Sequence, residues 1–390
     1  VNQGDELVLN NITLFDADDT NGDALEGSNN VVNASSSTTT VVLNEKGSLD
    51  FVVANDGDNK DEIVDVVLAG TNSVALAEIE LEANDEDVKI GGLGSRNIQS
   101  PDQVKDLSDQ LQSFSKNGLL ISIDQEGGGT NRLKSNYGFP ETPSWNHMGH
   151  LDNDLMTLQF SQTIASTLNN CGINVNFAPV LDLHYGDETI IGKAERANSP
   201  IPKTVIQHSR IFIQSLKENN IISCGKHFPG QGSAFGDTHK GSTDISDTWT
   251  VKDLLPFDEL IKFGDLDMIM VSHTFDDKLD KKFPSSLSKE IITGTLRNDL
   301  GFDGVVICDD PSMKAISEHY NIEDSFELML NAGVDLFCLG NNLNYDPDYI
   351  PKVIDAICHL VKIGKISENR LLDSIKRIDS LKKKYNIHGK

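Results

Sequence analysis

The chain has 390 residues, of which 38% are apolar and 24% are charged, and its formal net charge is −27 at pH 7. These fractions are ordinary for a globular protein, and the length suits two domains. The strong negative charge argues against nucleic acids and anionic membranes as partners. No run of eighteen apolar residues occurs, so the sequence predicts no membrane span.

Residues 1–90 form an unusually acidic segment, with twenty Asp or Glu side chains against three lysines and no Cys, Trp or Tyr. Short β-branched runs separated by Asn, Asp and Gly predict strands within 6–15, 38–56 and 62–83. We therefore expect a small β-rich, sandwich-like domain over 1–90. Its composition favours an extracellular or cell-surface location, with association to the surface through this domain; the cytoplasm is the alternative.

The stretch DADDTNGDALE (16–26) gathers carboxylates around a glycine. A solvated acidic loop is the default interpretation of such a cluster. A calcium site is the alternative, although the glycine does not fall in the EF-hand register.

From residue 91 the pattern changes to short apolar strands that alternate with amphipathic helices. Nearly continuous apolar strands are typical of a parallel sheet that is covered on both faces. Repeated βα units of this length predict a TIM-type (β/α)₈ barrel or a doubly wound sheet over 91–390. The expected strands are 119–128, 173–184, 221–227, 267–273, 304–310 and 334–342, and the expected helices include 101–117, 155–172, 203–220, 289–301 and 324–333.

Nearly every expected strand ends in polar or charged residues. In a TIM barrel the carboxyl ends of the strands meet at one mouth, where the active site lies. This shared feature favours the barrel over the doubly wound sheet. The strand-end residues are Asp124 and Glu126, Asp182 and His184, Lys226 and His227, His273, Asp309 and Asp310, and Asn341 and Asn342.

The five cysteines all follow residue 90 and lie mostly in apolar stretches. An odd number at such positions predicts buried free thiols and no disulfide framework. No CxxC spacing occurs, which argues against a cysteine metal site. The positions are Cys171, Cys224, Cys308, Cys338 and Cys358.

The segment KHFPGQGSAFGDTHKG (226–241) combines several glycines with two histidines and an aspartate. A structural loop needs glycine for positive φ, but it rarely needs such a density of titratable groups. With four other ordered motifs, this segment resembles glycoside hydrolase family 3, in its β-N-acetylhexosaminidase branch, over about residues 90–385. The other motifs are IDQEGG…RL (123–133), IMVSH (269–273), PSSLS (284–288) and LRNDLGFDGVVICDDPSM (296–313).

The resemblance implies that Asp309 is the catalytic nucleophile. Retaining glycoside hydrolysis needs one carboxylate that attacks the anomeric carbon and a second group that protonates the leaving oxygen. Its neighbour Asp310 would point to the opposite side of an extended chain, because side chains alternate there. We therefore expect Asp310 to be structural, and an exchange of the two roles is the alternative.

In this branch the acid/base is a histidine held by an aspartate on a mobile loop, and His239 and Asp237 match that pair. The aspartate can fix the tautomer of the imidazole and stabilise the imidazolium. The glycines at 230, 232 and 236 are expected to let the loop close over the sugar and reopen.

The resemblance also implies the sugar contacts. Asp124 and Arg132 match the pair that binds sugar hydroxyls, and Glu126 is expected to be their structural partner. No metal and no organic cofactor are expected, because a carboxylate and an imidazole suffice for the reaction. The further basic residues expected in the pocket are Arg196, Lys226, His227 and His273.

These inferences predict a retaining exo-β-N-acetylglucosaminidase for peptidoglycan- or chitin-derived sugars. A β-glucosidase-type hydrolase of the same family is one alternative, although its members generally lack the Asp-x-His loop. A non-catalytic sugar-binding surface protein is another, because GGLGSRNIQSP (91–101) follows the acidic domain without a clear first strand and helix. Either the stretch 75–90 supplies a substitute first strand or the barrel is incomplete at its first unit.

Overall fold

The computed structural model describes residues 100–340, 346 and 348–388, together with the backbone of six short strands between residues 6 and 81. The acidic stretch 16–26, the residues 91–99 and the pair Asn341 and Asn342 lie outside the described residues. The predictions made for those positions therefore stay predictions.

The described part is organised around one sheet of seven parallel strands. Neighbours in the sheet are also successive along the chain, whereas a doubly wound sheet reverses its strand order at a switch point. The sheet is therefore TIM-like, as the strand ends predicted, and closure into a complete eight-unit barrel stays a prediction. In order, the strands are β6 (Glu78–Leu81), β7 (Leu120–Ile123), β10 (Val175–Asn176), β11 (Ile222–Phe228), β13 (Met268–Val271), β15 (Val305–Cys308) and β16 (Leu336–Phe337).

The first position of the sheet is filled by β6, which pairs in parallel with β7 from Glu78 opposite Leu120 to Leu81 opposite Ile123. The stretch 75–90 thus supplies a substitute first strand, which is the first of the two alternatives drawn from the sequence. The described sheet has seven strands and the residues between β6 and Ser100 lie outside the described range, so the completeness of the first unit stays a prediction.

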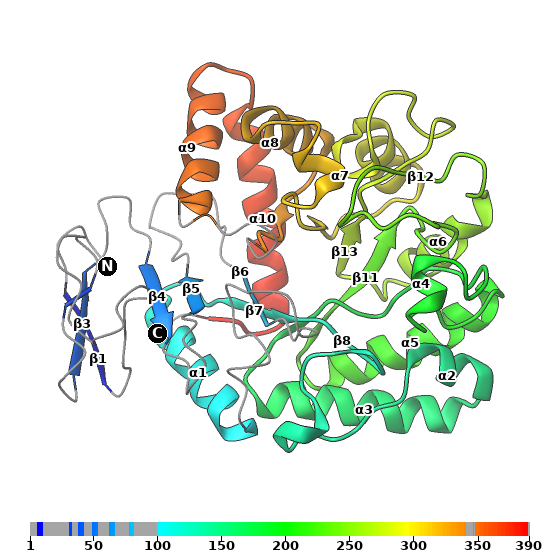
Figure 1. The fold of residues 1–390 in the computed structure, drawn as a ribbon, viewed down its shortest axis with the longest axis horizontal. Helices are drawn as coiled ribbons and strands as arrows, with labels where there is room; N and C mark the ends of the chain where they lie inside the picture. The colour runs from blue at the N-terminus through cyan, green and yellow to red at the C-terminus, as the bar shows by residue number, and fades with distance from the viewer. Residues whose placement is uncertain are drawn as a thin grey trace.

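Helices connect and cover the strands (Figure 1). Helix α3 packs on α5, α5 packs on α6 and β11, and α8 packs on α9. In Figure 1, α3 and α5 lie below β11 and β13, and α8 and α9 lie above them. The longer helices are α1 (Pro101–Phe114), α3 (Asp154–Asn170), α5 (Pro202–Glu218), α6 (Leu255–Lys262), α8 (Ile322–Ala332), α9 (Tyr349–Lys362), α10 (Glu368–Lys384) and a π-helix over Glu290–Asp299; α2 (Trp145–Leu151), α4 (Ile190–Lys193) and α7 (Lys314–Ser317) are short.

Several helices begin where the sequence provides a cap. The side chain of Ser100 accepts a hydrogen bond from the backbone N–H of Gln103, and Pro101 follows at the first helical position of α1. The side chain of Asn321 caps α8 in the same way. These caps satisfy backbone donors that have no partner inside the helix.

The strands bury both faces, and alternate residues contribute to different clusters. In β13, Met268 and Met270 belong to an inner cluster, while Ile269 and Val271 pack toward the helices. The inner cluster takes side chains from six successive strands, β7 to β16, and also Ile378 from α10. Because α10 and the residues after it join this inner cluster, the interior is a packed core and not a channel.

Two small antiparallel sheets precede the parallel sheet. Strands β1 (Glu6–Asn10), β3 (Thr38–Val42) and β2 (Val31–Val32) form one, and β4 (Leu49–Val53) and β5 (Glu62–Val66) form the other. The β-rich character predicted for this region is present. Its arrangement as a sandwich, and the division of the chain at residue 90, stay predictions.

All five cysteines are free thiols, as predicted, but their burial is only partly as predicted. Four are buried, whereas Cys358 is exposed on α9. The buried positions of α9 include Ile350, Val353, Ile357 and Leu360, which repeat with the period of a helix, and Cys358 lies off that face. Separately, none of the described helices is long and apolar enough to cross a membrane.

Candidate active site

A buried cluster of ionic side chains lies at the carboxyl ends of β7 and β11. The ammonium group of Lys226, which is 2% exposed, donates to a carboxylate oxygen of Asp124 and lies 2.7 Å from Oε1 of Glu126. Arg132 donates to the other oxygen of Asp124 at 3.2 Å. Opposite charges from the ends of two strands thus meet inside the mouth, as the strand-end residues predicted.

Arg196 completes this cluster from the segment that precedes α5. Its guanidinium binds Glu126 through two hydrogen bonds of 2.8 and 2.7 Å, a contact that fits the structural role expected for Glu126. It also lies 3.2 Å from Nε2 of His227, and Nδ1 of His227 lies 2.7 Å from Asp182. Because a guanidinium can only donate, Nε2 accepts and Nδ1 carries the proton toward Asp182.

The charges in the cluster shift the pKa values of its members. Burial raises the pKa of Glu126, but Arg196 and Lys226 outweigh burial and lower it to about 2. Burial also raises the pKa of Asp124, but Lys226 and Arg132 outweigh it and hold this pKa well below its usual range. Both carboxylates therefore stabilise the fold above about pH 4, and this stabilisation is lost as the pH falls toward the lowered pKa values.

Asp309 directly follows β15 and is partly accessible, whereas Asp310 is buried. Burial raises the pKa of Asp309, but the imidazoles of His273, His227 and His239 outweigh it, and the pKa is lowered overall. The carboxylate of Asp310 accepts from the backbone N–H of Ser312 at 2.8 Å and from its hydroxyl at 2.6 Å. Asp309 is thus the more accessible of the two side chains and its lowered pKa favours the ionised form, whereas the carboxylate of Asp310 holds the turn at Ser312.

His273 is 1% exposed and lies close enough to Asp309 for its imidazole to lower the pKa of that carboxylate. Its Nδ1 lies 2.7 Å from the hydroxyl of Ser286, and its Nε2 lies 2.9 Å from the backbone oxygen of Asp310. A direct bond from His273 to a sugar, as the sequence suggested, would require one of these contacts to break. The geometry instead favours a role in fixing the segment that carries Asp309.

The expected pair on the glycine-rich loop is formed. Nδ1 of His239 lies 2.9 Å from Oδ1 of Asp237, while the imidazole side chain remains 54% exposed. Between them, the buried Thr238 accepts a hydrogen bond from the backbone N–H of Ala315 at 3.2 Å, and its hydroxyl contacts the sulfur of Met313 at 3.8 Å. The loop is therefore docked on the chain segment that follows Asp309.

From the sequence, the loop glycines were expected to let the loop close and reopen. In the structure, two of them instead allow the backbone to pack closely against its neighbours. A Cβ at Gly232 would lie 2.0 Å from the backbone oxygen of Leu183. Gly230 has a φ of +122°, and a Cβ there would lie 2.6 Å from the Cβ of Asp253. Residues 230–234 are buried, so the first half of the loop is fixed and only its second half reaches solvent.

Asp253 supports the base of this loop and was not identified from the sequence. Its Oδ2 accepts from the hydroxyl of Tyr185 at 2.9 Å and from the backbone N–H of Thr250 at 3.0 Å, while its buried Oδ1 has no hydrogen-bond partner. Burial raises the pKa of Asp253 to about 6. The spacing Thr250-x-x-Asp253 is a local signal for a capping box, which is formed here. The contacts with Tyr185 and Gly230 come from distant parts of the chain, so the sequence could not show that Asp253 supports the loop.

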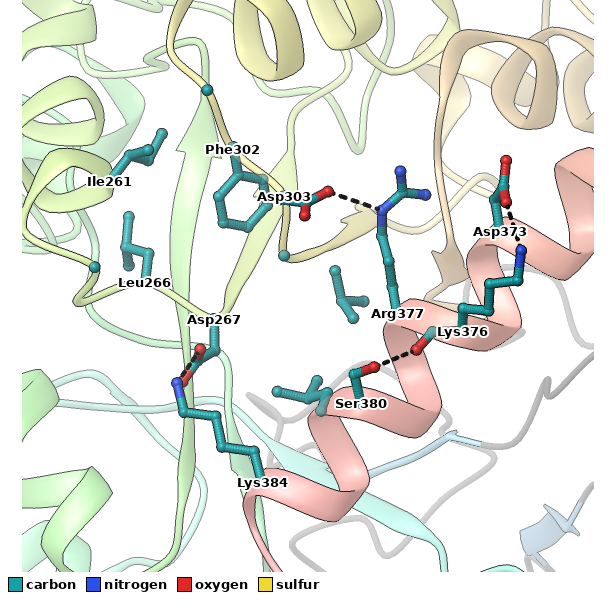
Figure 2. Close-up of a pocket in the computed structure, with 15 residues that line it drawn as sticks. Ile261, Leu266, Asp267, Phe302, Asp303, Asp373, Lys376, Arg377, Ser380 and Lys384 are labelled. Atoms are coloured by element: carbon teal, nitrogen blue, oxygen red, sulfur yellow. Dashed lines mark hydrogen bonds and ion pairs between the residues drawn. The ribbon is translucent and has the colours of Figure 1, made fainter.

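A cavity of about 680 Å³ lies at the opposite end of the sheet from the ionic cluster (Figure 2). It is lined by residues that precede β13 and β15, including Asp267 and Asp303, and by α10. Lys384 pairs with Asp267, and Arg377 lies 3.8 Å from Asp303. This end of a TIM-like sheet does not carry catalytic groups, so the mouth remains the candidate active site.

In the described ranges, no group of three or more His, Cys, Asp and Glu side chains is arranged to hold a metal ion. The residues predicted for the site do gather at the mouth. Asp124, Arg132, Arg196, Lys226 and His227 form one contiguous network, and His273, Asp309 and the loop pair form the other.

Comparison with known proteins agrees with this geometry. Residues 73–381 match the model of the Glycosyl hydrolase family 3 N terminal domain. The chain belongs to glycosyl hydrolase family 3. It is 32% identical over 279 residues to a beta-hexosaminidase of Nitrosomonas eutropha, covering 69% of this chain and 77% of the relative. A beta-hexosaminidase of Psychromonas ingrahamii is 36% identical over 259 residues, covering 64% and 74%.

Solved structures of the family have the same fold. A β-N-acetylglucosaminidase of a Paenibacillus species is 30% identical with a TM-score of 0.70, over 76% of this chain and 56% of that one. A β-N-acetylhexosaminidase of Beutenbergia cavernae is 26% identical with a TM-score of 0.67, over 73% and 86%. The chain thus spans little more than half of the Paenibacillus enzyme. The family match and these similar proteins identify the chain as a glycoside hydrolase.

The close packing of the loop at Gly232 can be tested with the substitution Gly232→Ala. The added methyl group would clash with the backbone oxygen of Leu183 and displace the segment that carries His239, so kcat/KM for a chromogenic glycoside substrate should fall by about 100-fold. Gly294→Ala is the matched control, because its nearest neighbours lie 3.9 Å away in the π-helix. Equal activity of the two variants would contradict the role assigned to Gly232.

Asp253→Asn should raise the stability of the protein at alkaline pH. Because the folded-state pKa of Asp253 lies above its usual value, ionisation opposes folding, and this penalty grows between about pH 4 and pH 6 and persists above it. The variant should therefore gain about 1–3 kcal/mol in the free energy of unfolding at pH 8 and little at pH 4. Chemical denaturation at both pH values measures this difference.

The exposed Asp247 provides the control for that comparison, because Asp247→Asn changes a carboxylate outside the core. A gain for Asp253→Asn that is the same at pH 4 and pH 8 would show that burial of its charge is not the cause.

Proposed function

We propose that the protein is a retaining exo-β-N-acetylglucosaminidase with Asp309 as nucleophile and His239 as acid/base. The observation that carries this proposal is the placement of an ionised, partly accessible carboxylate among three imidazoles, with a histidine–aspartate pair docked on the same segment. The names of the similar beta-hexosaminidases and β-N-acetylglucosaminidases support the choice of substrate.

In the first step, Asp309 attacks the anomeric carbon and forms a covalent ester while the glycosidic bond breaks. His239 gives the proton on Nε2 to the leaving oxygen, and the hydrogen bond from Nδ1 to Asp237 fixes the required tautomer. In the second step, a water molecule attacks the same carbon, gives its proton to Nε2 of His239, and releases Asp309 as a carboxylate. The anomeric configuration is thereby retained.

The ionic cluster at β7 and β11 suits the hydroxyl groups of the terminal sugar. The side chain of Asp124 is 12% exposed, against 2% for Lys226 and for Glu126, and Arg132 beside it holds its carboxylate in a fixed orientation. Lys226 uses two of its three donors on Asp124 and Glu126, which leaves one donor for a sugar oxygen. In this proposal Arg196, His227 and His273 orient these groups through the bonds described above.

The β-glucosidase-type alternative is less well supported, because this chain carries its own histidine–aspartate pair on the loop. A preference for peptidoglycan- or chitin-derived sugars, and a location at the cell surface through the acidic first 90 residues, are the remaining parts of the proposal. Comparison of turnover on N-acetylglucosaminides and glucosides distinguishes the two activities.

Substitution of the nucleophile separates Asp309 from its neighbour. Asp309→Asn should lower kcat for an aryl N-acetylglucosaminide by about 1,000-fold or more, because the covalent step loses its attacking group. Asp310→Asn, which removes one hydrogen bond within the loop, should lose about 10-fold or less. The reverse order of the two effects in steady-state kinetics would exchange the assignments.

Removal of the acid/base should have an effect that depends on the leaving group. His239→Ala should slow cleavage of a sugar leaving group by about 100-fold or more, since general acid catalysis contributes that much, and slow a nitrophenyl leaving group less. His150→Ala, at an exposed histidine of α2, serves as the control. A loss that is equal for both leaving groups would argue against proton donation by His239.

A further inference from the structure

A cavity of about 620 Å³ begins two residues after Asp309. Its wall includes Pro311 and Ser312, Tyr320 and Glu323 before and within the first turn of α8, and Tyr349 at the start of α9. Each of these helices follows a strand and runs back along the sheet, so their first residues lie at the carboxyl ends of the strands. The cavity therefore opens at the same end of the molecule as the active site.

The cavity shares a wall with the catalytic groups. The segment 309–315 carries Asp309, holds Ser312 through the carboxylate of Asp310, and accepts the loop of His239 through Thr238 and Ala315. Three peptide units separate Asp309 from Ser312, a distance of at most about 11 Å along the chain. The cavity thus lies next to the position where the glycosidic bond would break.

The position along the sheet indicates which side of that bond the cavity serves. The ionic cluster for the terminal sugar lies at β7 and β11, whereas the cavity lies between the segments that follow β15 and β16. Asp309, at the end of β15, stands between the two. His239, which protonates the leaving oxygen, is docked on the same segment that forms the cavity wall.

The lining suits a carbohydrate. The side chains of Tyr320 and Tyr349 are half-buried and pack in part against the core between the sheet and the helices, and the phenol of Tyr349 lies near Asp310. Both residues also line the cavity, and among the described residues no hydrogen bond is made to either phenolic hydroxyl. An aromatic ring packs on the apolar face of a pyranose, and its hydroxyl can bond a sugar oxygen or an amide. The exposed carboxylate of Glu323 can accept hydrogen bonds from sugar hydroxyls.

We propose that this cavity is a subsite for the sugar residue on the leaving-group side of the scissile bond, with Tyr320 and Tyr349 as its main contacts. The inference rests on the proposed hydrolase function, because it assigns the second sugar of the same substrate. It predicts that contacts in the cavity stabilise the transition state for cleavage of a disaccharide. A substrate with a single-atom leaving group does not make these contacts.

The test compares two substrates, N,N′-diacetylchitobiose and the β-fluoride of N-acetylglucosamine. The fluoride has no second sugar, so the cavity stays empty when it reacts. The double variant Tyr320→Phe/Tyr349→Phe should lower kcat/KM for the disaccharide by about 10-fold, as expected for the loss of two hydrogen bonds, and change that for the fluoride by less than about twofold. Ser317→Trp, which places an indole on an exposed position of the cavity wall, should show the same selective loss.

Tyr137→Phe is the matched control, because it removes a phenolic hydroxyl from a residue that packs against a different cluster. It should leave both substrates within about twofold of the original protein. An equal loss for both substrates in the cavity variants, or no loss for the disaccharide in either of them, would overturn the assignment.

Failure of the proposed function is distinguishable from failure of the subsite. If the unmodified protein cleaves neither substrate, the hydrolase proposal fails, and calorimetric titration with N,N′-diacetylchitobiose still decides the subsite. Binding that is weakened in the double variant and not in Tyr137→Phe supports the assignment. Binding that is absent, or equal in all three proteins, contradicts it.

Discussion

The buried contact of Lys226 with Asp124 and Glu126 is the constraint on which the rest of the mouth depends. An ammonium group that is 2% exposed is tolerated only when carboxylates compensate it, and both carboxylates lie in the segment after β7, which β10 separates from β11 in the sheet. Arg132 and Arg196 then compensate the second negative charge. Removal of one partner would leave an uncompensated buried charge, which typically costs about 3–5 kcal/mol. The same side chains therefore define the fold at this end and present the polar surface for a sugar.

The groups to which the proposal assigns the reaction follow other strands of the same sheet, and His227 links them electrostatically to this cluster. Asp309 directly follows β15, where three imidazoles lower its pKa, and it stays ionised in a largely enclosed position. The loop with His239 is fixed at its base by the contacts of Gly230 and Gly232 and at its far side by Thr238. Both ends of the loop are held in place, while the imidazole of His239 between them stays exposed. The imidazole can therefore be positioned precisely and still be reached by a substrate.

The parts of the molecule that follow from local sequence were predictable. Continuous apolar runs indicated the strands, and polar strand ends indicated that Asp124, Lys226 and Asp309 share one mouth. The bond between His239 and Asp237 links residues two positions apart, so the sequence could anticipate it. The substitute strand β6 was one of two stated alternatives, because its pairing with β7 depends on residues about forty positions away.

Other features depend on contacts that no local pattern encodes. Asp253 meets Gly230 and Tyr185 only in the folded chain, and the closure of the inner core by α10 joins the last helix to six strands. The loop glycines were interpreted as sources of movement, since the sequence cannot show that the backbone oxygen of Leu183 occupies the space of a Cβ at Gly232. The tyrosine-lined cavity also joins segments from two separate βα units.

The covalent intermediate provides the most direct test of the central claim. A fluoride of N-acetylglucosamine that carries a second fluorine at C5 would form the glycosyl ester and hydrolyse it slowly, and peptide mass spectrometry would locate the sugar. The account predicts one added sugar on the peptide that contains Asp309, with fragmentation placing it on that side chain and its loss on prolonged incubation. A label on Asp310, Asp124 or Glu126, or steady turnover in the complete absence of a label, would contradict it.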